Sequence, residues 1–139
     1  MSLDLSSLRK ALAALQRALV RCEAAPADEE LRDACIPRFE FTFELAWKMI
    51  KRRLELDLPS RDEVDALSWR GLMCRATEAG LVDNPTPWFE WRDCRNLTSH
   101  TYDAAKAAQV RAALPGFAQA AAELLVRLER RSADDAGPQ

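Results

Sequence analysis

The stretch RFEFTFELAWK, residues 38–48, decides the fold that the sequence predicts, because it places apolar side chains on two sides of one helix. The first stripe recurs at helical spacing and consists of Phe39, Phe43, Ala46, Trp47, Ile50 and Leu54. The second stripe, Phe41, Leu45 and Met49, lies on nearly the opposite side. A helix that is apolar on two sides must be covered on two sides, at the centre of a bundle or at a subunit interface. We therefore predict a helix over residues 29–56 and assign Phe41, Leu45 and Met49 to the interface of a homodimer.

Charged side chains occupy the band between the two stripes of this helix. Four of them recur at spacings of three and four: Glu40, Glu44, Lys48 and Lys51. Such a band is usually solvated, and one Glu44–Lys48 pair across a helical turn contributes little to stability. The band is therefore expected to face water.

A second helix is expected on the N-terminal side, over Ser6–Ala24. Its apolar side chains form a narrow seam for one packing partner: Leu5, Leu8, Leu12, Leu15, Leu19 and Cys22. Asp28 has the position of an N-cap for the helix that follows. Within that helix Pro37 removes a backbone donor and clashes with the preceding turn, so we expect a kink near residues 33–38 or two helices meeting there.

The connection after the long helix is expected to contain two shorter helices. Ser60-Arg61-Asp62-Glu63 has the spacing of a capping box, which starts a short helical turn. A further helix is predicted over residues 69–79. Gly80 follows it as the residue in the left-handed conformation.

Two more helices complete the predicted bundle. Thr86 is placed to cap the first of them, whose Trp88 and Trp91 are three apart and so have core spacing rather than that of a base-stacking platform. The second covers residues 103–131, and Pro115-Gly116 should kink or split it. Its buried stripe consists of Val110, Leu114, Phe117, Ala121, Leu124, Leu125 and Leu128.

Composition agrees with an all-helical chain. Hydrophobic residues make up 48% of the 139 residues and there are only 4 glycines, which is typical of helical proteins rich in alanine and leucine. We predict an all-α fold, an antiparallel up-and-down bundle of four or five helices that forms one domain over residues 1–131. Residues 132–139 have the composition of a disordered tail.

Charge, cysteine spacing and hydropathy limit the classes of function. The formal net charge is −2, so RNA binding would depend on a local patch such as Arg92, Arg95 and Lys106. The 4 cysteines lack metal-ligand spacing, so we expect reduced, buried thiols and neither a metal nor a cofactor. Because we find neither a signal peptide nor an apolar run near the length of a membrane span, we expect a cytoplasmic protein.

The stretch RNLTSHTY, residues 95–102, contains the only histidine and the only tyrosine of the chain. Histidine can take and release protons near neutral pH, since its unperturbed pKa is about 6.5. The planar guanidinium of arginine suits phosphate. His100 and Arg95, with the amide of Asn96 beside them, are thus a minimal set of groups for phosphoryl-transfer chemistry without a metal.

Helical geometry limits how these side chains can cooperate. On an unbroken helix Arg95 and His100 would point about 140° apart, because each residue turns by roughly 100°. Either the helix breaks between them, or His100 meets an arginine of another chain. Ser and Thr interrupt helices by bonding to the backbone, so we predict a helix end near residues 97–98, a corner carrying His100 and a new helix near Tyr102. In the alternative reading a hydroxyl simply caps a helix, Tyr102 packs and His100 is a surface residue.

Three segments together resemble the nucleotidyltransferase substrate-binding family, which belongs to the HEPN (higher eukaryotes and prokaryotes nucleotide-binding) superfamily. They are RFEFTFELAWK at residues 38–48, Gly80-Leu81-Val82, and RNLTSHTYD at residues 95–103. The resemblance extends from the first helix to about Leu128. The sequence departs from the family pattern at Pro37, Trp69, Trp91 and an apparent insertion over Pro59–Leu67.

The resemblance implies an antiparallel helical bundle that dimerises and a cognate nucleotidyltransferase of minimal type as partner. Similar members act as toxins of two-gene toxin–antitoxin modules. In them the arginine and histidine of the motif cleave RNA without a metal, and the partner silences the toxin by adenylylating the motif tyrosine. These roles correspond to Arg95 and His100 as the catalytic pair, Asn96 as a supporting residue and Tyr102 as the modified residue. Two alternatives remain: a non-catalytic subunit that binds substrate or nucleotide for the partner enzyme, and a plain helical interaction module.

Overall fold

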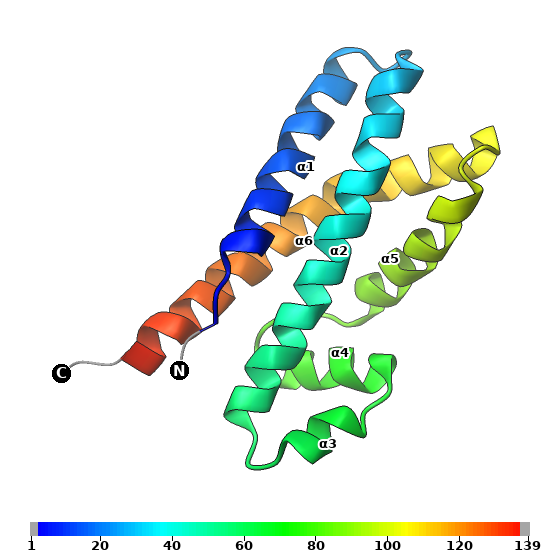
Figure 1. Cartoon of the computed structure of the whole chain (residues 1–139). Helices are drawn as coiled ribbons and strands as arrows, with labels where there is room; N and C mark the ends of the chain where they lie inside the picture. The colour runs from blue at the N-terminus through cyan, green and yellow to red at the C-terminus, as the bar shows by residue number, and fades with distance from the viewer. Residues whose placement is uncertain (1–2, 137–139) are drawn as a thin grey trace.

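Helices account for nearly all of residues 3–136, the part of the chain that the structure, a computed structural model, describes (Figure 1). They are α1 (Ser6–Ala24), α2 (Glu29–Asp57), α3 (Arg61–Asp65), α4 (Trp69–Glu78), α5 (Thr86–Leu97) and α6 (Ala104–Ala136). A 3-10 turn, Thr98–His100, joins α5 to α6. Residues 3–136 contain no strand, which confirms the predicted all-α class, and no helix among them is long and apolar enough to cross a membrane.

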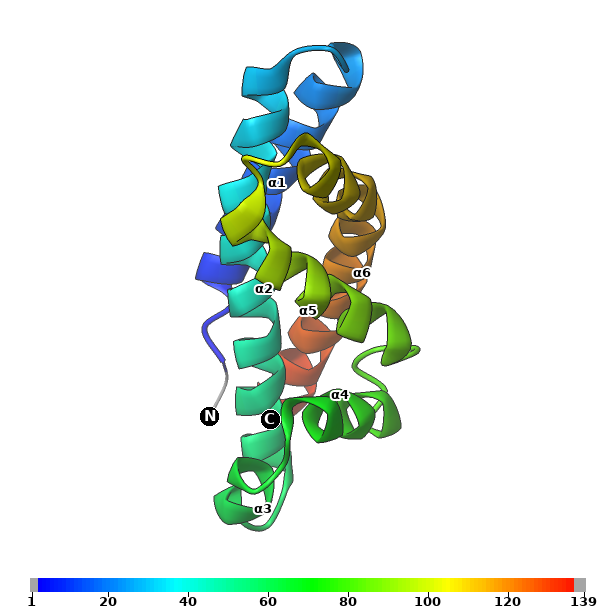
Figure 2. The same cartoon turned by 90° about the vertical axis from the view of Figure 1, so that its right-hand side faces the viewer.

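The long helices α1, α2, α5 and α6 alternate in direction along the chain (Figure 1). The up-and-down arrangement that the sequence predicted is therefore confirmed. The short helices α3 and α4 lie in the connection between α2 and α5, at the end of the bundle where α2 terminates (Figures 1 and 2). Helix α6 packs against α1, α2 and α5, so it contacts each of the other long helices.

An aromatic cluster joins α2, α5 and α6 in the core. The ring centroid of Phe117 on α6 lies 5.1 Å from that of Phe39 on α2 and 5.4 Å from that of Trp91 on α5, both in edge-to-face geometry. Trp88 is 2% exposed and lies 5.9 Å from Phe117. Edge-to-face pairs add about 0.5–1.5 kcal/mol to the burial of the rings themselves. Trp88 therefore belongs to the core and the half-buried Trp91 packs against it, as their spacing predicted, and the pair fixes α5 against α2 and α6.

The second apolar stripe of α2 is covered differently from the prediction. Met49 is 5% exposed within the single chain, so it belongs to the core and offers no surface to a partner subunit. The reason is that α2 packs against all five other helices, which cover it on more sides than a simple bundle would. Leu45 is half-buried, whereas Phe41 is 68% exposed. Only Phe41, with part of Leu45, remains available for the interface to which we assigned the stripe.

Neither internal proline divides its helix. We expected either a kink or a division at each proline; helix α2 runs through Pro37 and α6 runs through Pro115, so neither position divides a helix. Both prolines are exposed, and buried residues flank them on the opposite side of each helix. Burial of these neighbours offsets the cost of about 3 kcal/mol that a proline imposes on a helix interior.

Local signals define several helix ends. The carboxylate of Asp28 accepts two backbone N–H groups in the first turn of α2, as an N-cap does. Gly80 has a φ of 80°, and the backbone hydrogen bonds around it are those of a Schellman motif at the end of α4. The expected cap at Thr86 is corrected, because the side chain of Asn84 instead accepts the N–H of Thr86 at 3.0 Å.

The cysteines divide into three buried thiols and one exposed thiol. All are free, and Cys74 is exposed, which corrects the expectation that every cysteine is buried. Burial raises the pKa of Cys35 to about 11, and the neighbouring Cys22 contributes in the same direction. Cys35 is therefore a protonated thiol at neutral pH, as a small core residue would be.

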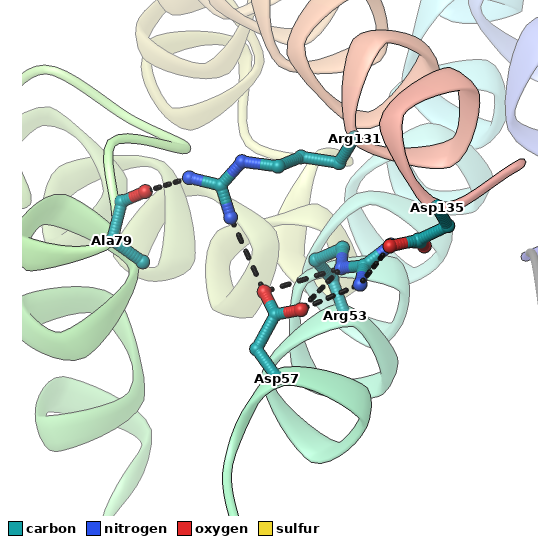
Figure 3. Close-up of polar contacts among 5 residues, drawn as sticks. All are labelled: Arg53, Asp57, Ala79, Arg131 and Asp135. Carbon is teal, nitrogen blue, oxygen red and sulfur yellow. Dashed lines mark hydrogen bonds and ion pairs between the residues drawn. The ribbon is translucent and has the colours of Figure 1, made fainter. Parts of the chain in front are cut away.

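A network of ion pairs attaches the end of α6 to α2 and to the end of α4 (Figure 3). Arg53 on α2 is only 3% exposed and donates to the carboxylates of Asp57 and Asp135. Arg131 on α6 donates to Asp57 at 3.2 Å and to the backbone carbonyl of Ala79. The hydrogen bonds to Asp57 and then Asp135 raise the pKa of Arg53, so its charge is permanent.

Because of this network, the C-terminal boundary differs from the prediction. Helix α6 continues to Ala136, beyond residue 131, where we predicted the domain to end and a disordered tail to begin. Asp135 lies in that predicted tail, and its partner Arg53 is 82 residues earlier in the chain. Composition alone cannot reveal a partner at that separation. Residues 137–139 of the predicted tail lie outside the described residues.

We expect Arg53→Ala to lower the free energy of unfolding by about 2–3 kcal/mol. Losing one partner of a buried ion pair costs about 3–5 kcal/mol, and we expect less here because each aspartate keeps about a third of its side chain exposed. Urea denaturation at neutral pH would measure the change. Arg52→Ala is the matched control, since Arg52 is an exposed neighbour and should change stability by less than about 0.5 kcal/mol.

The same network should make stability depend on pH. The pKa of Asp135 lies below its usual 3.8, chiefly because Arg53 donates to its carboxylate. A lowered folded-state pKa gives stability that is complete above 3.8 and is lost as pH falls through the folded value. From pH 7 into this acidic range, wild type should lose more stability than Asp135→Asn. Equal losses in the two proteins would contradict the assignment of this pH dependence to Asp135.

Candidate functional site

Side-chain hydroxyls build the corner between α5 and α6. The hydroxyl of Thr98 donates to the backbone carbonyl of Arg95 at 2.7 Å. The hydroxyls of Ser99 and Thr101 donate to the carbonyls three residues before them, each at 3.2 Å. These carbonyls would otherwise accept N–H groups of a further helical turn, so α5 ends here. The predicted helix break at residues 97–98 is confirmed.

Helix α6 begins directly after the corner with a cap of its own. The carboxylate of Asp103 accepts the backbone N–H of Ala105 at 2.9 Å and that of Lys106 at 3.4 Å. The start of α6 at Ala104 agrees with the helix predicted near Tyr102. His100 and Tyr102 therefore lie on a short, defined corner between two capped helix ends rather than on a long loop.

His100, Tyr102 and Asn96 are all exposed on this corner. The side chain of Tyr102 is 86% exposed, so the alternative in which it packs into the core is not observed. The ring centroids of His100 and Tyr102 are 6.1 Å apart with an interplanar angle of 73°. A group bound to one ring would therefore contact the other.

Arg95 is held by residues of two helices. Its Nη1 lies 3.3 Å from Oε2 of Glu40, and its Nε lies 3.5 Å from Oε1 of Glu44, both on α2. Nη1 also donates to the hydroxyl of Thr98 at 3.2 Å. The band of α2 that we expected to be solvated thus contributes two carboxylates to the site, which corrects that expectation. The packing of α5 on α2 brings Arg95 over this band.

These side chains line a shallow pocket of about 190 Å³, made by Pro37, Glu40, Phe41, Glu44 and Arg95. The side chain of Arg95 is 34% exposed, so part of the guanidinium reaches the pocket. Its Nε is buried without a hydrogen-bond partner, although Glu44 is within ion-pair distance. Nε is therefore closed to a ligand, and Nη1 donates to Thr98, whereas no hydrogen bond among the described residues uses Nη2, which can donate to an anionic group that enters the pocket.

The structure brings the predicted site residues to one corner but does not join all of them. Within residues 3–136 no hydrogen bond or ion pair connects Arg95 with His100, which agrees with the poor convergence expected from their spacing. No group of three or more His, Cys, Asp or Glu side chains among the described residues could hold a metal ion. Proton exchange at the corner and anion binding at the pocket are the chemistry that these side chains can provide.

Glu40, Glu44 and Thr98 are the site residues that sequence reasoning missed. The spacing of Glu40 and Glu44, four apart on one helix, was visible in the sequence, but a carboxylate pair of this kind is normally solvated. Their partner is on another helix, far along the chain. Thr98 was recognised only as a helix breaker, and its contact with the guanidinium depends on the rotamer of Arg95.

The chain is similar to known proteins over almost its full length. Residues 3–130 match a family model described as nucleotidyltransferase substrate binding protein like. A Haemophilus influenzae protein named probable ribonuclease HepT is 38% identical over 100 residues, which cover 72% of this chain and 68% of that protein.

Two solved structures share the fold. A Haemophilus influenzae protein, described as having the fold of a substrate binding domain of a nucleotidyltransferase, superposes with a TM-score of 0.84 at 31% identity, covering 91% of this chain and 99% of that one. A protein from Thermus thermophilus superposes with a TM-score of 0.71, also at 31% identity, covering 87% of this chain and 98% of that one. The arrangement of helices that carries the corner is therefore shared with these proteins.

Proposed function

Because the chain belongs to the nucleotidyltransferase substrate-binding family, we propose that it is the HEPN-type subunit of a two-component nucleotidyltransferase system and that it cleaves RNA without a metal ion. The observation that carries the proposal is the exposed His100 on a corner whose other end holds Arg95 at an open pocket. Similarity to a protein named probable ribonuclease HepT supports the same reaction.

In the proposed reaction His100 acts as a general base. Its imidazole takes the proton of a ribose 2′-hydroxyl, and the 2′-oxygen attacks the adjacent phosphorus. The bond from phosphorus to the 5′-oxygen breaks, and that oxygen takes a proton from solvent. The products are a 2′,3′-cyclic phosphate and a 5′-hydroxyl end. DNA lacks the 2′-hydroxyl and should not be cleaved.

Arg95 has the role of binding the phosphate and stabilising the negative charge that develops on it. Glu40 and Glu44 keep the guanidinium in one orientation over the pocket, and Thr98 contacts it from the 3-10 turn that follows α5. An oriented donor loses less conformational entropy when the phosphate arrives. Asn96, exposed one residue later, supports the same phosphate from the side of the corner.

The experiment that tests the proposal is an RNA cleavage assay in EDTA with the purified wild-type chain. We expect cleavage of RNA that leaves 2′,3′-cyclic phosphate ends and no cleavage of DNA of the same sequence. A preparation that is inert on varied RNAs, and harmless when expressed alone in bacteria, would contradict ribonuclease activity. That outcome would favour the alternative below.

A homodimer is part of the proposal. Phe41 is 68% exposed beside Arg95, and an exposed aromatic ring at the edge of a pocket is a frequent interface residue. A second copy would place two sets of Arg95 and His100 together, which would overcome the separation of the two side chains in one chain. Analytical ultracentrifugation at micromolar concentration should give twice the chain mass, and Phe41→Glu should shift the species towards monomer. A wild-type chain that stays monomeric at these concentrations would exclude the composite site.

In the proposed system this chain is the toxin of a two-gene module. Its partner is a cognate minimal nucleotidyltransferase that silences the toxin by adenylylating Tyr102. Support comes from the family description and from the accessibility of the phenol, which is 86% exposed. A toxin that acts on cellular RNA would work in the cytoplasm.

The alternative is a non-catalytic subunit that binds substrate or nucleotide for the partner enzyme. One observation favours it, since Glu40 and Glu44 offset the charge of Arg95 and so weaken its attraction for phosphate. One of the related structures is also described as a substrate binding domain of a nucleotidyltransferase. Under this alternative the wild-type chain binds a nucleotide but leaves RNA intact.

A further inference from the structure

Two arginines stack on aromatic rings at the junction of α4 and α5. The Cζ atom of Arg70 lies 4.3 Å from the ring centroid of Phe89, and that of Arg92 lies 4.8 Å from the ring of Trp69. The rings of Trp69 and Phe89 are 6.2 Å apart in edge-to-face geometry, so the two stacks are adjacent. We call the surface made by Trp69, Arg70, Phe89 and Arg92 the arginine platform.

The guanidinium groups of the arginine platform lie over their rings and are open to solvent, and no hydrogen bond among residues 3–136 uses their N–H groups. Arg70 and Arg92 are exposed, whereas the rings beneath them are half-buried. Neither arginine forms an ion pair within the part of the chain that the structure describes, unlike Arg53 and Arg131, which bind aspartates. Stacking on a ring orients the guanidinium plane without using its hydrogen-bond donors.

The arginine platform is continuous with the candidate site. Arg92 precedes Arg95 by three residues on α5, which places the two on one side of the helix about 4.5 Å apart along its axis. Trp69 stacks on Phe43 of α2 at 5.9 Å, and the next residue, Glu44, pairs with Arg95. A strand of nucleic acid with its phosphate at Arg95 would therefore extend over the platform.

We propose that the arginine platform binds an unpaired nucleobase and the adjoining phosphate of single-stranded RNA next to the phosphate held at Arg95. The free faces of the guanidinium planes stack on the base, and their N–H edges bind the phosphate oxygens. In a duplex each base is stacked between its neighbours and cannot reach the platform. The inference rests on the proposed function only because that function identifies RNA as the occupant. Binding of RNA to the platform can be measured without cleavage.

The test uses the full-length His100→Ala variant in EDTA, so that the RNA stays intact, and a short, fluorescein-labelled, single-stranded RNA of mixed sequence. Fluorescence anisotropy would give the dissociation constant of this RNA for three variants made in the His100→Ala background. Arg70→Ala with Arg92→Ala should weaken binding by about tenfold or more. Arg70→Lys with Arg92→Lys keeps the charge but not the planar stack, and should also weaken binding. Arg17→Ala with Arg130→Ala removes the same charge from two other exposed positions and should change binding by less than about threefold.

Each outcome decides the inference. Single-stranded DNA should bind about as tightly as RNA, because stacking and phosphate contacts do not need the 2′-hydroxyl, and duplex RNA should compete poorly. Three results would each overturn the base-stacking role. The lysine variants could bind RNA as tightly as the parent, or the control variants could lose as much affinity as the platform variants. The third is an acidic peptide that competes as well as RNA. If wild type cleaves no RNA but the platform variants lose binding, the ribonuclease proposal fails and the platform stands. If wild type cleaves RNA and the platform variants bind RNA normally, the ribonuclease proposal stands and the platform proposal fails.

Discussion

Replacing His100 with alanine is expected to lower the rate of RNA cleavage by about 10²–10⁴-fold, the contribution of one general base. The fold should be unchanged, because His100 is exposed on the corner and its side chain supports no helix end. Arg95→Ala should lower the rate by about 10²–10³-fold, the effect of removing one group that stabilises charge in the transition state. Rates from single-turnover cleavage of a labelled RNA in EDTA would measure both effects.

The controls separate chemistry from structure. Ser99→Ala alters the residue next to His100 and removes one of the three hydroxyl bonds of the corner, while Thr98 and Thr101 keep the other two, so it should retain most of the activity. Arg95→Ala leaves Glu40 and Glu44 without the cation that they pair with. Arg95→Lys restores the positive charge but not the planar guanidinium group. We expect partial recovery in the lysine variant. Full activity in His100→Ala, with the helical circular dichroism of the wild type, would exclude the histidine from the reaction.

Adenylylation of Tyr102 is expected to reduce cleavage to the level of the His100→Ala variant. In this step the phenol oxygen of Tyr102 bonds to the α-phosphorus of ATP, pyrophosphate leaves and the phenol proton passes to solvent. The attached nucleotide would bring a phosphate and a large base to within contact of the His100 ring, which is 6.1 Å from the tyrosine ring. Its negative charge would repel the RNA phosphate and compete for the donors of Arg95.

Incubation with the cognate nucleotidyltransferase, ATP and magnesium, followed by peptide mass spectrometry, would locate the modification. The peptide that contains Tyr102 should gain one adenylate, and cleavage should fall in proportion to the modified fraction. Tyr102→Phe should keep ribonuclease activity, accept no adenylate and escape silencing. Label on a different residue, or equal inhibition of Tyr102→Phe by the partner, would show that the switch does not operate through this phenol.

Features that depend on residues close in sequence were predictable. The apolar seams of α1 and α6 are buried as their helical spacing required, and so is the first stripe of α2 except for the half-buried Trp47. Asp28 and Gly80 define the helix ends expected of them. The break after α5 follows from three hydroxyls that bond to carbonyls three residues earlier. All of these interactions lie within one or two helical turns, so the pattern of residue types is sufficient to locate them.

The tertiary structure decided the features that depend on residues far apart in the chain. Met49 is in the core because α2 has five packing partners, and α6 extends to Ala136 where Asp135 meets Arg53. Glu40 and Glu44 hold Arg95 only because α5 packs across their band of α2. A charge pattern on one helix is compatible with solvent or with a partner, and the free energy of each depends on what the packing of other helices brings within a few ångströms. The sequence alone therefore identified the motif of Arg95, His100 and Tyr102, while the packing of α5 on α2 determined which groups hold the arginine and which surface continues beside it.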